Sequence, residues 1–438
     1  MKRMNVDKLI PIEKLTDENF TKTLTKLKKR REISYKSVRK DVELILEDIK
    51  IGGDDSVIDY TEKFDHAKLS RTTLRVSKKE IDDAYSHVTD EQVVAVKDAK
   101  RKLEIVEKKV LRRLQGTLLD KDGITVKTVT RPIQNIGCYV PGGEASYPSS
   151  LIMTVTPAKV AGAKRVVVCS PPMDDAKLNP LLLVASDICG VDEFYRVGGV
   201  QAIGAMAYGT DIIKPVQKIV GPGNVYVTEA KRIVANQISV DSPAGPTELL
   251  VICDSSANPS LIAQDIIAQS EHGTTSICGL ITDSKSIAEG VSRTIASLIK
   301  KIPRRNIVSG ALANAFIFVC QDISLAVKFT NSFAPEHLQI ISKKQDKVSE
   351  NIKNSGLVLL GKYSPVAATD YAIGTSHVLP TLGYARTTSG LSVIDYTKRV
   401  NIVECSKKGL KSLRKTINVL AEAEGLLNHS ASVEARFK

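Results

Sequence analysis

Four of the six histidines stand in polar or glycine-rich segments of the C-terminal part of the chain: His272, His337, His377 and His429. A neutral imidazole nitrogen is a good zinc ligand, and histidine also titrates near neutral pH. His66 and His87 lie in charged helical segments and are interpreted as surface residues. The other four histidines therefore point to metal binding or proton transfer.

Other side chains, near His272 and further along the chain, offer additional ligands for a cation. Gln269 and His272 are three residues apart at the end of an expected helix, so their side chains share a face. Asp370 contributes a carboxylate from a segment rich in Gly, Thr and Ser. A polar helix end explains Gln269 and His272 equally well when they are taken alone. Together with His429, these residues suit a divalent cation such as Zn²⁺, with positions left open for substrate.

A carboxylate and an imidazole stand side by side at Glu336 and His337, just before an apolar stretch that predicts a strand. Such a pair suits proton transfer, because partial burial can raise the pKa of Glu toward that of His. A solvated turn is the alternative interpretation.

Two glycine-rich turns, at residues 198–204 and 221–224, each lie between an expected strand and an expected helix. Backbone amides at a helix N-terminus bind phosphate well. Neither turn is a GxGxxG motif followed by an acidic residue, so a dinucleotide is one interpretation and tight packing turns are the other.

The periodicity of apolar residues predicts an α/β protein. Residues 7–115 are expected to be mostly helical, with a break at Gly52–Asp55. From about Gly123, expected strands alternate with helices in steps typical of doubly wound parallel sheets. A last amphipathic helix is expected to stop at Gly425.

The composition of the 438 residues, 42% hydrophobic and 25% charged, is that of a globular protein. No apolar run is long enough for a membrane span, and the first residues do not resemble a secretory signal. Seven scattered cysteines favour a reducing compartment, so a cytoplasmic location is expected. The net charge of +13 leaves nucleic-acid binding as an alternative, although the basic run at 22–40 is interpreted as a solvated helical face.

Eight ordered motifs between about residues 130 and 435 carry a resemblance to a known family: IGCYVPGG, VGGVQAIGAMAYGT, KIVGPGNVYVTEAKR, DSPAGPTELLV, AQSEHG, FAPEHL, DYAIGTSHVLPT and AEAEGLLNHSASV. This set resembles the histidinol dehydrogenases. The resemblance implies a zinc-dependent enzyme of histidine biosynthesis that oxidises L-histidinol to L-histidine in two NAD-linked steps, through L-histidinaldehyde.

The resemblance also implies a role for each matched position. The zinc ligands would be Gln269, His272, Asp370 and His429, and the acid/base pair would be Glu336 and His337. The residues in contact with NAD would be Tyr139, Gln201 and Asn224. The residues in contact with substrate would be Thr247, Gln269, His272, His337, Asp370, His377, Glu424 and His429. Thr247 stands where Ser is usual, and Thr369 stands where Gly is common.

The domain organisation implied is two incomplete Rossmann-like domains with small helical segments at both ends. The expected division is 1–34 as an N-terminal segment, 35–138 plus 247–391 as the first domain with most of the metal site, 139–246 as the NAD-contacting domain, and 392–438 as a C-terminal segment exchanged in a homodimer. His429 would then act in the partner's site. An enzyme that acts on another amino alcohol or a sulfonate, and a nucleic-acid-binding protein, are the competing hypotheses.

Overall fold

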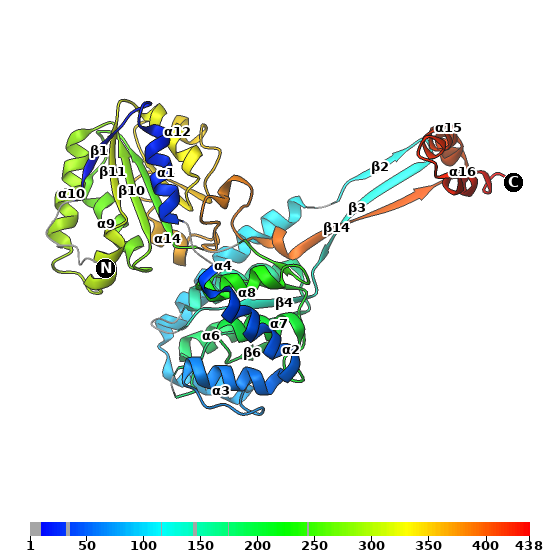
Figure 1. The fold of residues 1–438 in the computed structure, drawn as a ribbon, viewed down its shortest axis with the longest axis horizontal. Helices are drawn as coiled ribbons and strands as arrows, with labels where there is room; N and C mark the ends of the chain where they lie inside the picture. Colours follow the sequence, from blue (N-terminus) through cyan, green and yellow to red (C-terminus); the bar gives the residue numbers. More distant parts are fainter. Residues whose placement is uncertain (1–9, 32–35, 115, 143–146, 174, 243–244) are drawn as a thin grey trace.

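The computed structural model describes residues 10–31, 36–114, 116–142, 147–173, 175–242 and 245–438. Gly143, Pro243 and Ala244, which belong to the motifs quoted above, lie outside the described residues. Two lobes built on parallel sheets lie side by side, and a long arm that carries the C-terminus projects away from both (Figure 1). The predicted α/β class with parallel sheets is confirmed.

The first lobe is built on a six-stranded sheet in the order β1-β11-β10-β9-β12-β13, in which all neighbours are parallel. Its strands are β1 (Ile12–Leu15), β9 (Glu248–Cys253), β10 (Ile277–Thr282), β11 (Phe316–Cys320), β12 (His337–Ile341) and β13 (Leu357–Leu360). Its helices are α1 (Phe20–Arg31), α9 (Pro259–Ser270), α10 (Lys285–Leu298), α11 (Arg305–Leu312), α12 (Ile323–Phe333), α13 (Gln345–Ser349) and α14 (Val366–Tyr371). The central strands are buried on both faces, as their unbroken apolar runs require.

The second lobe is built on a five-stranded parallel sheet in the order β6-β5-β4-β7-β8. Its strands are β4 (Asn135–Tyr139), β5 (Arg165–Cys169), β6 (Glu193–Tyr195), β7 (Lys218–Val220) and β8 (Ser239–Val240). Its helices are α2 (Lys36–Asp65), α3 (Lys78–Ala84), α4 (Asp90–Arg113), α5 (Pro148–Ala161), α6 (Pro180–Cys189), α7 (Gly199–Tyr208) and α8 (Val225–Val234), with the short η1 (Tyr85–His87). The break expected near Gly53 is a kink inside α2, where Gly53 leaves the helical conformation.

The N-terminal helices pack differently from the predicted division. Val42 and Ile49 of α2 share a core with Ile203 of α7, and Leu103 of α4 shares one with Leu151 of α5. Residues 36–113 therefore belong with the five-stranded sheet, whereas the prediction joined them to 247–391. An apolar stripe shows that a helix packs on something, but it does not show which sheet carries the complementary face.

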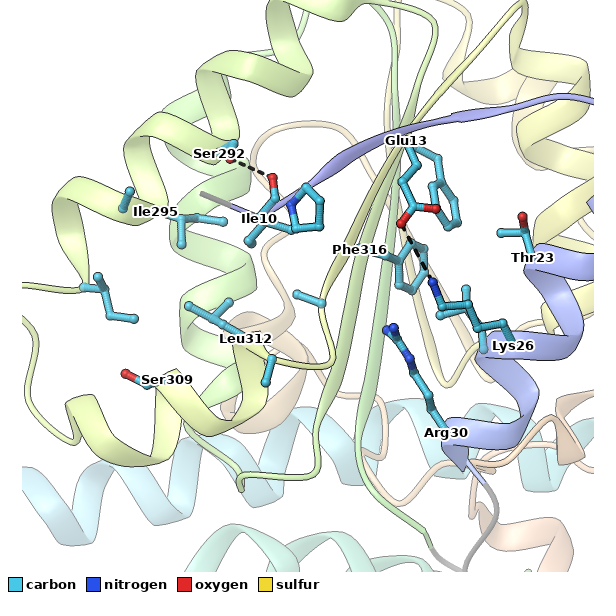
Figure 2. A pocket seen from close by; sticks show the side chains of 17 residues that line it. Ile10, Glu13, Thr23, Lys26, Arg30, Ser292, Ile295, Ser309, Leu312 and Phe316 are labelled. Carbon is cyan, nitrogen blue, oxygen red and sulfur yellow. Dashed lines mark hydrogen bonds and ion pairs between the residues drawn. The ribbon is translucent and has the colours of Figure 1, made fainter. Parts of the chain in front are cut away.

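Residues 12–31 contain the predicted N-terminal helix and, before it, a short strand. β1 is the edge strand of the six-stranded sheet and pairs with β11, and Phe20 and Leu27 of α1 pack into that lobe's core. Between this edge and α10–α11 lies a cavity of about 360 Å³. Figure 2 shows Glu13 and Lys26 on one side of it and Leu312 on the other. Its described lining includes none of the predicted site residues.

The arm is a three-stranded antiparallel ribbon, β14-β3-β2, capped by two helices. Its elements are β2 (Leu118–Lys121), β3 (Ile124–Pro132), β14 (Thr397–Cys405), α15 (Lys407–Ala423) and α16 (Leu427–Glu434), and the turns η2 (Tyr384–Arg386) and η3 (Val393–Tyr396) precede β14. The predicted stop at Gly425 is confirmed, because Gly425 adopts a φ of 73° just after α15. A second helix, α16, follows this stop, and His429 lies in it.

Candidate active site

A cavity of about 690 Å³ lies between the two lobes. Eight predicted site residues line it: Asn224, Thr247, Gln269, His272, Glu336, His337, Asp370 and His377. On one side, the cavity is lined by the turns after β7 and β8, at the carboxyl ends of strands of the five-stranded sheet. On the other side, it is lined by Thr247 and Glu336, which directly precede β9 and β12 of the six-stranded sheet. The amino edge of one sheet thus faces the carboxyl edge of the other.

Glu336 and His337 are almost completely buried at the start of β12. The Oε2 atom of Glu336 accepts hydrogen bonds from the Thr247 hydroxyl at 2.6 Å and from the Glu248 amide at 2.8 Å. Nδ1 of His337 lies 3.4 Å from the same carboxylate oxygen and 3.1 Å from the Glu248 carbonyl oxygen. A carbonyl only accepts, so this contact assigns the proton of a neutral imidazole to Nδ1.

This tautomer leaves Nε2 of His337 as the basic nitrogen. Nε2 is buried and has no hydrogen-bond partner among the described residues, and His337 lines the cavity. Burial opposes charge on His337, but the adjacent Glu336 carboxylate outweighs it and raises the pKa of His337. Burial alone would raise the pKa of Glu336, but His337 and the hydrogen bonds donated to the carboxylate outweigh burial and lower this pKa. Each residue therefore favours the charged form of the other.

Gln269, His272 and Asp370 come together at the same cavity. Gln269 is buried at the end of α9, and its Nε2 donates to Thr247 Oγ1 at 2.6 Å. His272 lies two residues beyond the helix, in a turn, and its Nε2 is 3.9 Å from Asp370 Oδ2. Asp370 belongs to the short helix α14, where the preceding Thr369 is buried and bonds Val366. Threonine at position 369 is therefore accommodated in ordinary helix.

The ring of His377 contacts both lobes at the site. Its Nδ1 lies 2.9 Å from the Asp370 carbonyl oxygen, and its Nε2 lies 3.4 Å from the Ser150 hydroxyl of α5. Burial lowers the pKa of His377, with nearby Asp370 acting in the opposite direction. A neutral His377 is therefore available as a hydrogen-bonding group for substrate.

A cation between His272 and Asp370 fits the donors that one chain supplies. In a tetrahedral zinc site, two ligand atoms bound at about 2.0–2.2 Å lie roughly 3.4 Å apart, so the 3.9 Å between the two side-chain atoms has to shorten by only about half an ångström. Across the described residues, however, no three His, Cys, Asp or Glu side chains converge as a metal site. The set within one chain is therefore incomplete.

His429 and Glu424 do not reach this cavity in their own chain. Both are exposed near the tip of the arm, which extends away from the lobes (Figure 1). Neither lines the cavity.

The predicted NAD-contacting residues gather at the carboxyl edge of the five-stranded sheet. The Tyr139 hydroxyl, at the end of β4, accepts a hydrogen bond from the Gly199 amide at 3.2 Å. A Cβ on Gly221, whose φ is 119°, would lie 2.0 Å from the Tyr139 carbonyl oxygen, so the turn requires glycine. Gln201 is buried in the first turn of α7. Asn224 lines the cavity, and its Oδ1 caps α8 by accepting from the Tyr226 and Val227 amides.

Arg31 and Glu248 are functional candidates that the sequence analysis missed. Glu248 is fully buried at the start of β9, and it accepts hydrogen bonds from Arg31, Glu336 N and Leu382 N. A carboxylate opening an apolar strand was a usable signal, because a buried charge requires a partner. Arg31 gave no signal of its own, since it lies within the basic run at 22–40 interpreted as a solvated face.

The comparisons with known proteins agree with this geometry. The family model described as histidinol dehydrogenase matches residues 28–437. The chain belongs to the histidinol dehydrogenase family. The histidinol dehydrogenase of Methanocaldococcus jannaschii is 42% identical over 427 residues, 98% of each chain. That of Clostridium acetobutylicum is 41% identical over 94% of this chain and 95% of its own.

A solved structure agrees as well. The crystal structure of histidinol dehydrogenase from Elizabethkingia anophelis matches with a TM-score of 0.92 at 35% identity, over 98% of each chain. Membership of the histidinol dehydrogenase family makes this chain an NAD-dependent oxidoreductase of histidine biosynthesis. Among the described residues, no helix is long and apolar enough to cross a bilayer.

Proposed function

We propose that this chain oxidises L-histidinol to L-histidine in two steps at the cavity between the lobes, with L-histidinaldehyde as the intermediate. The observation that carries the proposal is the buried, unpartnered Nε2 of His337, which lines the cavity beside Glu336. A base in this position is suited to take the proton of a substrate hydroxyl. Each step consumes one NAD⁺ and releases one NADH, and the second also consumes one water.

The two residues divide the proton transfers. His337 takes the hydroxyl proton as the alcohol carbon gives up hydride, so the alcohol becomes the aldehyde. Glu336 then takes a proton from the water that adds to the aldehyde carbon, so that the hydrate can give up a second hydride and become the carboxylic acid. The Thr247 hydroxyl, 2.6 Å from Glu336 Oε2, holds that carboxylate in place.

The metal ligands in this proposal are Gln269, His272, Asp370 and His429, and the ion is Zn²⁺. When bound, the ion would supply a Lewis-acid contact that fixes the substrate's imidazole and amine near the nicotinamide. The proximity of His272 Nε2 and Asp370 Oδ2, which lie 3.9 Å apart, supports a cation shared by these two side chains. Manganese and cobalt are the alternatives, because amide and carboxylate oxygens accept several ions.

A homodimer would complete the site. The arm exposes Leu118, Val403 and Leu427, with exposed fractions of 68%, 63% and 65%. Apolar side chains gathered on a projecting ribbon and its cap favour an interface. The arm would bring His429 as a ligand and Glu424 as a substrate contact to the partner's cavity. Thr247, His377 and the remaining ligands would contact substrate from the chain's own lobes.

The other parts of the proposal are the coenzyme contacts and the location. Tyr139, Gln201 and Asn224 would contact NAD at the carboxyl edge of the five-stranded sheet, where ligands of doubly wound folds bind. Six buried cysteines without disulfide partners suit a reducing compartment, so the cytoplasm is proposed.

NADH production from histidinol, with metal analysis of the purified protein, tests the proposal. We expect about one zinc per chain and two NADH for each histidinol consumed. His272→Ala removes a ligand and should abolish both bound zinc and turnover, whereas His87→Ala, an exposed histidine, should leave both unchanged. Absence of NADH with histidinol but turnover of another amino alcohol would contradict the substrate. Salt-dependent nucleic-acid binding without metal would support the alternative class.

A further inference from the structure

Asp65 stands at the carboxyl edge of the five-stranded sheet although it belongs to a distant part of the sequence. It is the last residue of α2, which packs along α7. Its Oδ2 lies 3.4 Å from Nε2 of Gln201, a residue 136 positions later in the chain. Tyr139 is close enough for the Asp65 carboxylate to add to the rise in the pKa of Tyr139 that burial causes. The carboxylate thus lies beside two proposed NAD contacts.

The polar groups of this cluster are incompletely satisfied. Asp65 is half-buried and forms no ion pair with a described lysine or arginine side chain. Burial raises the pKa of Asp65 to about 6, with only His66 acting in the opposite direction. Gln201 is 1% exposed, and its Oε1 has no hydrogen-bond partner among the described residues. Unused acceptors at the edge of a cofactor-binding sheet indicate a ligand that donates hydrogen bonds.

The place that an acidic residue usually occupies in a dinucleotide fold is taken here by proline. In such folds an acidic residue after the second strand binds the ribose hydroxyls. β5 is the second strand of this sheet and is followed by Ser170, Pro171 and Pro172. Pro171 packs against Gly198, where an added Cβ would lie 2.4 Å from the proline ring. A carboxylate for these hydroxyls would therefore have to come from another element, and Asp65 at the end of α2 lies beside the first turn of α7.

We propose that Asp65 binds the ribose hydroxyls of the adenosine half of NAD and thereby selects NAD over NADP. The inference rests on the proposed NAD site at Tyr139, Gln201 and Asn224. A ribose diol donates hydrogen bonds that a carboxylate and the Gln201 carbonyl oxygen can accept. A 2′-phosphate in the same place would bring a second negative charge beside Asp65 with no described lysine or arginine paired to that carboxylate.

The test is the coenzyme preference of Asp65→Asn, measured as kcat/KM for NAD and for NADP at saturating histidinol. Asn keeps the shape but removes the charge, so we expect the NAD-to-NADP ratio of kcat/KM to fall about 10- to 100-fold. The change should appear mainly in KM, because the chemical groups at Glu336 and His337 are untouched. Asp59→Asn, an exposed change on the same helix, is the matched control and should leave the ratio unchanged.

Gln201→Ala separates failure of this inference from failure of the proposed NAD site. If Gln201→Ala raises the KM for NAD while Asp65→Asn keeps the wild-type coenzyme ratio, the role of Asp65 is refuted and the NAD site stands. If neither variant changes the KM for NAD or the ratio, the site and the inference are both refuted. Asp65→Ser, which replaces the carboxylate with an uncharged hydroxyl, provides a second variant and should also lower the ratio. A purely structural role for Asp65 would lower the melting temperature without moving the ratio.

Discussion

The guanidinium of Arg31 and the carboxylate of Glu248 form a buried ion pair directly behind Glu336, with Nη2 and Oε2 2.6 Å apart. The same carboxylate oxygen accepts the Glu336 amide at 3.2 Å, and the other oxygen accepts the Leu382 amide at 3.1 Å. Arg31 also stacks on Phe333, with its guanidinium carbon 3.3 Å from the ring centroid. One ion pair therefore joins α1, β9, the start of β12 and the loop that follows α14.

Breaking this pair on one side should destabilise the protein strongly. Arg31→Met leaves the buried Glu248 carboxyl without its guanidinium partner, and we expect a loss of about 3–5 kcal/mol in the free energy of unfolding. In the double variant with Glu248→Gln, the loss should be smaller than the sum of the two single losses. Urea unfolding measures both quantities. Arg30→Met, at the exposed neighbouring position, is the control and should change stability little.

The stability should also depend on pH through Glu248. Burial raises the pKa of Glu248 to about 7, above its ordinary value of 4.5, although Arg31 acts in the opposite direction. Between these values the unfolded chain loses the proton that the folded chain keeps, so this group's contribution to stability falls as pH rises from about 4.5 to about 7. Urea unfolding of the wild type and of Glu248→Gln at pH 5 and pH 7.5 isolates the effect. An equal pH dependence in both proteins would contradict it.

Glu336→Gln should affect the second oxidation most. Loss of the carboxylate base is expected to lower the rate of the aldehyde step by about 10²- to 10⁴-fold. Aldehyde should therefore accumulate, and the yield should approach one NADH per histidinol in single-turnover experiments with an aldehyde trap. Glu350→Gln, at an exposed position, should keep the wild-type yield of two. Full oxidation to histidine at the wild-type rate in Glu336→Gln would rule out the assigned role.

The hydroxyl of Thr247 should matter more than its methyl group. It donates to Glu336 and accepts from Gln269, both at 2.6 Å. Thr247→Ser keeps both hydrogen bonds and should retain nearly full kcat. Thr247→Val keeps the shape but leaves a buried carboxylate and a buried amide each short of a partner, so kcat/KM should fall about 10-fold or more. Comparable kinetics for the two variants would show that the hydroxyl is not needed.

A site shared between subunits predicts complementation between inactive variants. His272→Ala and His429→Ala homodimers should each lack activity. In a heterodimer, one site carries both defects and the other carries neither, so about a quarter of all sites should be intact after random exchange. Activity regained on unfolding and refolding the mixture measures this. Continued inactivity of a mixture that has demonstrably formed heterodimers would place His429 outside the partner's site.

The local chemistry of the site could be predicted from the sequence. Gln269 and His272, Glu336 and His337, and the glycine turns each lie within a few residues of one another, and helix and strand geometry then decides which side chains meet. The fold class followed for the same reason, because the apolar period distinguishes helices from strands locally. The stop at Gly425 was likewise a local property of glycine.

Only the tertiary structure decided which distant groups meet. Arg31 pairs with Glu248 across 217 positions, and Asp65 meets Gln201 across 136. The tertiary structure likewise decided that α2 and α4 pack on the five-stranded sheet and that the arm projects from the lobes. A helix's spacing reveals that it has an apolar face, but the choice of partner depends on the shape of every other face in the chain, and no local pattern records that choice.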